Sequence, residues 1–201
     1  MHDALGIARA LKRIAPVKYP ERNLFRCVEM SALVGGANRR IQPLFDLGPG
    51  RSGQRFTPVG GPRALYVAED PYTSYLESTG MFDSVADLAE KLADTQSTLQ
   101  FRVQLEEVLD LTVADTMLEL GTNQEELLAS WEWQMATGAR VPTQDLGAAA
   151  FASKRFQAIR FTSAKRADHA NLVIFTDRVV APAFVECTDS NFFLRNTSKR
   201  A

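Results

Sequence analysis

Apolar and polar residues alternate along several short segments, which is the spacing that predicts β-strands with one buried face. In residues 99–109, apolar positions such as Phe101 and Val103 are separated by polar ones such as Arg102. Short apolar runs elsewhere predict further strands. Together these patterns predict strands at residues 24–30, 63–69, 99–109, 156–162 and 172–179.

Helical spacing and capping residues predict the helices. Asp70 offers a capping oxygen and Pro71 suits the first helical position, so a helix begins there and carries Glu77 about two turns in. A polar turn is expected between Ser163 and Asn171. The predicted helices cover residues 3–14, 70–77, 84–94, 110–120, 123–137 and 143–154.

Strands and helices are intermixed without regular alternation, which favours an α+β domain with small mixed sheets flanked by helices. The chain has 201 residues, 45% of them hydrophobic, so we expect a single domain over residues 1–201. Neither the GxxxxGK[ST] pattern nor GxGxxG occurs. These absences disfavour a P-loop nucleotidase and a Rossmann dehydrogenase.

Composition narrows the classes of partner. The formal net charge is −1, so nothing favours nucleic acid or an anionic membrane as a direct partner, whereas a small anion held by a few arginines fits. No apolar run has membrane-spanning length and residues 1–20 lack the core of a secretory signal, so we expect a cytoplasmic protein. The few cysteines and histidines have no metal-site spacing, and no metal is expected; they are Cys27, Cys187, His2 and His169.

The segment Gly53 to Glu77 holds the candidate chemistry. Its Gly- and Pro-rich loop at 57–62 allows close approach of the backbone to a ligand. Arg55 precedes this loop, Tyr66 lies on the following strand and Glu77 lies on the helix after it. Taken singly, each of these residues is more often a surface or core residue than a functional one.

Three segments together resemble the RES domain family: residues 24–26, residues 54–77, and residues 161–164 with 171–175. The family's arginine, glutamate and serine would be Arg26, Glu77 and Ser163. A second family arginine would be Arg55, and its strand tyrosine would be Tyr66. The resemblance covers residues 22–180. Three positions differ from the family pattern, because Phe56-Thr57 stands where Trp-Asn is common and Cys27 where an aromatic residue is frequent.

The resemblance implies a fold related to ADP-ribosyltransferases and a toxin of a bacterial toxin–antitoxin pair. It implies that NAD is a substrate whose nicotinamide–ribose bond is cleaved by phosphorolysis or hydrolysis, which would deplete NAD. Glu77 with Arg26 and Arg55 would be catalytic, and Arg26, Arg55, Tyr66 and Ser163 would bind NAD. An Xre-like antitoxin would block the pocket.

Several alternatives stay open at this point. The acceptor of the ADP-ribosyl group is inorganic phosphate, water or a protein side chain, and the last would make the protein an ADP-ribosyltransferase. A binding module that keeps the fold but has lost turnover is the alternative from a different class. A homodimer also stays open.

Overall fold

The structure is a computed structural model that describes residues 1–29, 53–79, 96–188 and 199–200. Its helices are α1 (Ala4–Arg13), α4 (Pro71–Thr79), α6 (Ala114–Glu119), α7 (Gln124–Leu128), α8 (Trp131–Ala136), α9 (Pro142–Ser153) and the 3-10 helix η2 (Thr176–Arg178). Its strands are β1 (Val17–Glu29), β2 (Leu65–Ala68), β3 (Gln96–Asp110), β4 (Ala158–Thr162), β5 (Ala170–Ile174), β6 (Phe184–Cys187) and β7 (Lys199–Arg200). The predicted helix at 84–94 and the end of the first predicted strand, Met30, lie outside the described residues.

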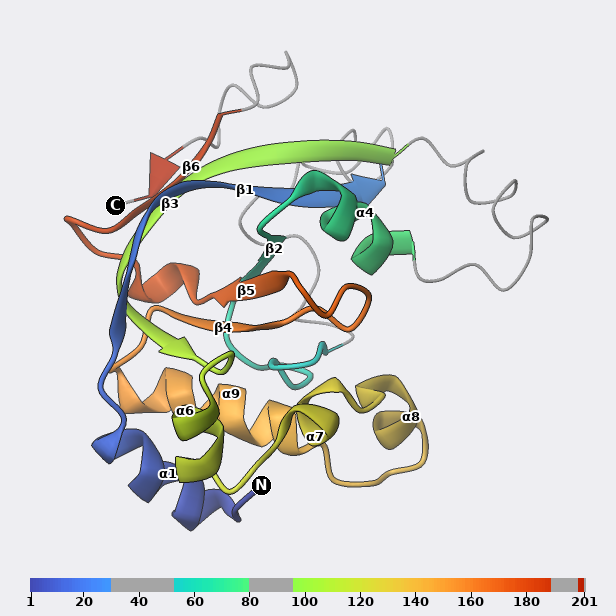
Figure 1. Cartoon of the computed structure of the whole chain (residues 1–201), viewed down its shortest axis with the longest axis vertical. Coiled ribbons are helices and arrows are strands. Elements are labelled where there is room, and N and C mark those ends of the chain that lie inside the picture. The colour runs from blue at the N-terminus through green and yellow to red at the C-terminus, as the bar shows by residue number, and fades with distance from the viewer. Residues whose placement is uncertain (30–52, 80–95, 189–198, 201) are drawn as a thin grey trace.

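The strands pair in the order β1-β2-β5-β4-β3-β6-β7, and β1 pairs with β3 as well. The long antiparallel β1–β3 ladder runs from Val17 opposite Val108 to Glu29 opposite Gln96. Since β3 also pairs in parallel with β4, the strands β1, β2, β5, β4 and β3 form a closed ring of pairings. In Figure 1, β1 and β3 curve together around β4 and β5.

Strand β5 lies between two apolar cores. Leu172 and Ile174 belong to the core shared with β1 and β3, whereas Val173 belongs to the core shared with α1 and α9. All five β5 residues are buried, as expected for a strand covered on both faces. Helices α1, α6, α7, α8 and α9 lie on one side of β4 and β5, and α4 lies on the other (Figure 1). The predicted α+β class is therefore confirmed.

The first predicted strand was wrong at its start, because β1 begins at Val17 rather than Leu24. Its early part contains charged residues and Pro20, which hide the strand pattern. The ladder with β3 shifts register between Val17 and Tyr19 and again between Tyr19 and Arg22. A bulged ladder tolerates a proline, since a residue there need not donate to the neighbouring strand.

Two predicted helices were too long. Strand β3 continues to Asp110, whose Oδ1 accepts from the backbone N–H of Thr112 at 2.9 Å, so α6 begins only at Ala114. The predicted helix at 123–137 is two short helices, α7 and α8. The chain leaves helical geometry at Ala129, and the Ser130 side chain caps α8.

Among the described residues, no helix combines the length and apolar character needed to cross a membrane.

Candidate active site

A pocket of about 820 Å³ opens where β1, β2 and α4 meet the loop at 53–57 and the α7–α8 turn. Four of the residues predicted from the sequence line it: Arg26, Arg55, Tyr66 and Glu77. The fifth, Ser163, is 1% exposed and contacts Glu77. The fold thus brings together residues from positions 26 to 163 of the chain.

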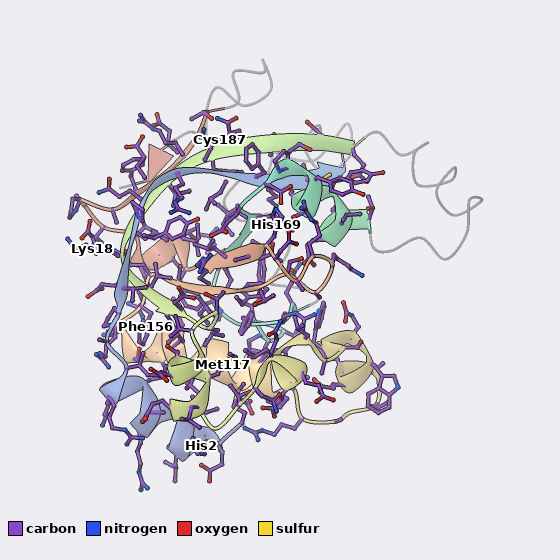
Figure 2. All side chains as sticks on the ribbon, viewed as in Figure 1. His2, Lys18, Met117, Phe156, His169 and Cys187 are labelled. Atoms are coloured by element: carbon purple, nitrogen blue, oxygen red, sulfur yellow. The ribbon has the colours of Figure 1, made fainter. Side chains whose placement is uncertain are left out.

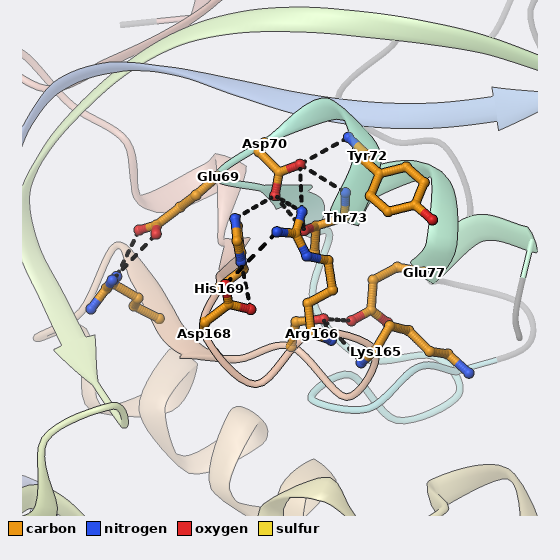
Figure 3. A network of polar contacts seen from close by, with 11 residues as sticks. Glu69, Asp70, Tyr72, Thr73, Glu77, Lys165, Arg166, Asp168 and His169 are labelled. Atoms are coloured by element: carbon orange, nitrogen blue, oxygen red, sulfur yellow. Dashed lines mark hydrogen bonds and ion pairs between the residues drawn. The ribbon is translucent and has the colours of Figure 1, made fainter.

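Glu77 lies on α4, and two side chains donate hydrogen bonds to its carboxylate. Its Oε1 accepts one hydrogen bond from Ser163 Oγ at 2.6 Å and another from Asn171 Nδ2 at 2.8 Å. Figure 3 shows Glu77 on α4 facing Lys165, which lies on the turn that follows β4. Glu77 itself is exposed to the pocket, so the carboxylate is both oriented and accessible.

The Ser163 hydroxyl is fully used within the protein. Its oxygen accepts hydrogen bonds from the backbone N–H groups of Lys165 and Arg166, each at 3.1 Å, and its O–H group donates a hydrogen bond to Glu77 Oε1. The Ser163 N–H donates to the His169 carbonyl at 2.8 Å. In this arrangement Ser163 supports Glu77, and its predicted contact with NAD stays a prediction.

The start of α4 is fixed by Asp70. Its carboxylate caps the helix by accepting from the N–H groups of Tyr72 and Thr73 at 2.9 and 3.0 Å, as the sequence predicted. Arg166 and His169 reach the same carboxylate at 3.2 and 3.3 Å (Figure 3). Burial raises the pKa of Asp70, but the Thr73 hydrogen bonds and the electrostatic interactions with His169 and Arg166 outweigh it and lower that pKa overall. The helix that carries Glu77 is thereby tied to the turn that carries Ser163.

Tyr66 uses its hydroxyl to hold the neighbouring loop. The oxygen accepts from the Phe56 N–H at 3.0 Å and lies 3.1 Å from Thr57 Oγ1. Burial raises the pKa of Tyr66 to about 12, offset in part by Thr57 and Phe56. The tyrosine is therefore neutral at physiological pH, and it is one of the residues that line the pocket.

Arg55 lines the pocket and reaches the turn between α7 and α8, which forms the rim of the pocket. Its Nη1 donates to the carbonyls of Leu127 and Ala129 at 2.6 and 2.9 Å, which are the carbonyls at the end of α7. Burial lowers the pKa of Arg55, opposed by the charges of Glu77 and Glu132. Arg55 thus holds the α7–α8 turn beside the pocket.

Arg26 enters the pocket from β1. Burial lowers its pKa to about 10, opposed by Tyr66, so the guanidinium is still charged at neutral pH. Arg26, Arg55 and the half-buried Lys165 give the pocket a positive wall beside the Glu77 carboxylate. Such a wall suits a ligand with phosphate groups.

Helix α9 supports the loop that carries Arg55. Gln144 Nε2 donates to the Gln54 carbonyl at 2.9 Å, and the backbone of Gly147 lies so close to Phe56 that a Cβ there would be 1.8 Å from the Phe56 carbonyl oxygen. Phe56 is fully buried, with its ring 4.7 Å from that of Phe161. Phe56 and Thr57, which depart from the family pattern, therefore serve packing and the Tyr66 contact.

Sequence reasoning missed four residues of this site: Asn171, Gln144, Lys165 and Trp131. Asn171 is a polar residue at the start of an otherwise apolar run, and that is the one local signal of the four. The roles of the other three depend on contacts between segments distant in sequence.

No group of three or more His, Cys, Asp or Glu side chains in the described part of the chain could hold a metal ion. The two histidines lie in different parts of the molecule, His2 beside α1 and His169 near α4 (Figure 2).

Comparisons with known proteins place this geometry in a family. No curated protein matches the sequence significantly. The fold is similar to a chain of the M. tuberculosis MbcT-MbcA toxin-antitoxin complex, with a TM-score of 0.59 and 17% identity, over 90% of this chain and 88% of that one. The RES domain profile matches residues 28–192, a range that starts just after Arg26 and includes Arg55, Tyr66, Glu77 and Ser163. The chain therefore belongs to the RES domain family.

Proposed function

We propose that this protein is the toxin of a toxin–antitoxin pair and that it consumes NAD by cleaving the nicotinamide–ribose bond. The observation that carries the proposal is the Glu77 carboxylate, fixed through one oxygen by Ser163 and Asn171 and facing a pocket with two arginines. A volume of about 820 Å³ lies within the roughly 300–1,000 Å³ typical of small-molecule sites.

The pocket supplies what this reaction requires. The pyrophosphate of NAD would lie against Arg26 and Arg55, which match phosphate oxygens as planar forks. As the bond between ribose C1′ and the nicotinamide nitrogen breaks, its electron pair leaves with neutral nicotinamide. Positive charge then develops on the ribose, and a preorganised carboxylate such as Glu77 stabilises that charge better than water does.

The acceptor completes the reaction by bonding to C1′. Inorganic phosphate would yield a phosphorylated ADP-ribose, and water would yield free ADP-ribose with release of one proton. Half-buried Lys165 at the pocket wall adds a third cation, which favours an anionic acceptor. Transfer to a protein side chain is the competing outcome.

Product analysis tests the proposal. Purified protein incubated with NAD should release nicotinamide, and the second product with and without phosphate identifies the acceptor. Glu77→Gln should abolish release, whereas Glu125→Gln, an exposed position on α7 away from the pocket, should not. Tight NAD binding without any product from the wild type would instead indicate a binding module that has lost turnover.

The proposed partner is a cognate Xre-like antitoxin that covers the pocket in the cytoplasm. The fold similarity to a protein crystallised as a toxin–antitoxin complex supports this partner. Expression of the chain alone should arrest growth, expression of Glu77→Gln should not, and co-expression of the antitoxin should restore growth.

A further inference from the structure

Asn171 is the second residue of β5 and lines the pocket. Its Nδ2 donates to Glu77 Oε1 at 2.8 Å, the same oxygen that receives the Ser163 hydroxyl. The residue is only 6% exposed, and the β2–β5 and β4–β5 ladders hold its backbone opposite Ala68 and Phe161. The donor is therefore held on the most buried strand of the sheet.

Two donors on one oxygen restrict the carboxylate. A single hydrogen bond from Ser163 would still allow Glu77 to rotate about that contact, whereas a second one from Asn171 fixes its plane. Glu77 Oε2 accepts no hydrogen bond from the described residues. The clamp therefore leaves one oxygen for a ligand, in a defined direction.

The other end of the Asn171 carboxamide has an unfavourable environment. Its Oδ1 is buried and has no hydrogen-bond partner among the described residues. A buried, unpaired amide oxygen is destabilising, and an apolar side chain of the same shape avoids that cost. Asparagine at position 171 is therefore unfavourable for stability. Its hydrogen bond to Glu77 explains why an asparagine is nevertheless present.

We propose that Asn171 is a positioning residue that holds the Glu77 carboxylate in its productive orientation at the expense of stability. The inference rests on the proposed function for its kinetic readout. Since Asn171 acts through Glu77, removing its donor should lower kcat for NAD while leaving NAD affinity nearly unchanged.

The variant Asn171→Leu tests this, because leucine has a similar shape but no donor. We expect kcat to fall at least about tenfold, the size of one charge-assisted hydrogen bond. The dissociation constant for NAD, measured by calorimetry, should stay within about threefold. The melting temperature should not fall. Thr176→Val is the matched control, because Thr176 Oγ1 is likewise a buried polar atom without a hydrogen-bond partner among the described residues. Thr176 does not line the pocket, so this substitution should leave kcat unchanged.

Asn171→Asp provides a second variant of the same size, in case leucine disturbs folding. It replaces the donor with an acceptor that repels the Glu77 carboxylate, so its kcat should fall at least as far. Wild-type kcat in either folded variant would overturn the inference, as would a loss of kcat in Thr176→Val equal to that in Asn171→Leu.

A crystallographic readout separates this inference from the proposed function. If the wild-type protein releases no nicotinamide, the proposed function fails, and crystal structures of wild type and Asn171→Leu decide the inference instead. The Glu77 carboxylate should leave its Ser163-bound orientation in the variant. An unmoved carboxylate would show that Asn171 does not position it.

Discussion

The Tyr66 hydroxyl accepts a hydrogen bond from the Phe56 backbone N–H at 3.0 Å, and this contact joins strand β2 to the loop that carries Arg55. From the other side, Gln144 and Gly147 of α9 hold the same loop. The loop is thus fixed between a strand and a helix, which explains how Arg55 keeps its place beside the pocket.

Tyr66→Phe should destabilise the protein by about 1–3 kcal/mol, because the buried Phe56 N–H loses its acceptor while the ring stays in place. Urea denaturation measures the change. Tyr72→Phe is the control, since Tyr72 is 59% exposed and its substitution should be nearly neutral. Equal effects of the two substitutions would contradict the role assigned to the Tyr66 hydroxyl.

Alkaline pH should destabilise the wild type through Tyr66. Its pKa is about 12 when folded, against 10.0 for an unperturbed tyrosine, so the unfolded chain loses the proton first. The stabilisation is fully present below pH 10 and is lost as the pH rises towards 12. This difference of two pKa units corresponds to on the order of 2–3 kcal/mol of unfolding free energy. The difference in unfolding free energy between wild type and Tyr66→Phe should therefore shrink between pH 10 and pH 12. A constant difference would show that folding does not raise the pKa of Tyr66.

Gly147→Ala should lower stability by about 1–3 kcal/mol or more, since the new Cβ would collide with the Phe56 carbonyl oxygen and push the loop away. Because that loop carries Arg55, NAD affinity should fall as well. Thermal melting and calorimetry measure the two effects. Ala152→Ser, at an exposed position of α9, should change neither. If Gly147→Ala lost stability but kept its NAD affinity, NAD binding would not depend on the position of this loop.

Much of the fold could be predicted from the sequence because the decisive signals are local. Alternation along 63–69 and 99–109 reports the two faces of β2 and β3, and Asp70 signals the start of α4 through its own cap. Glu77 could be placed on that helix for the same reason.

The remainder depends on contacts between distant segments. At the break between α7 and α8, the Leu127 carbonyl accepts a hydrogen bond from Arg55, which is 72 residues away in sequence. The helix propensity of residues 123–137 therefore does not indicate this break. Asn171 is 94 residues from Glu77, and only the pairing of β5 with its neighbours brings its amide to the carboxylate. The sequence therefore indicates part of the pocket lining, such as Arg55 and Glu77, whereas the residues that hold them in place become visible only in the fold.

Arg55→Lys should loosen the α7–α8 turn, because a lysine keeps the charge but lacks the long guanidinium fork that reaches the carbonyls of Leu127 and Ala129. The chain has two tryptophans, Trp131 and Trp133, and both lie on α8, so tryptophan fluorescence reports this rim directly. Trp133 is already 65% exposed, and the increase in acrylamide quenching should come from Trp131 at the pocket wall.

The same measurement connects the rim to the ligand. NAD should reduce quenching of Trp131 in the wild type and do so less in Arg55→Lys, whose NAD affinity should be lower. Arg9→Lys, at an exposed position of α1, is the matched control and should behave as wild type. Equal quenching in wild type and Arg55→Lys would show that the turn holds its position without Arg55, and that the guanidinium contributes to the pocket through its charge alone.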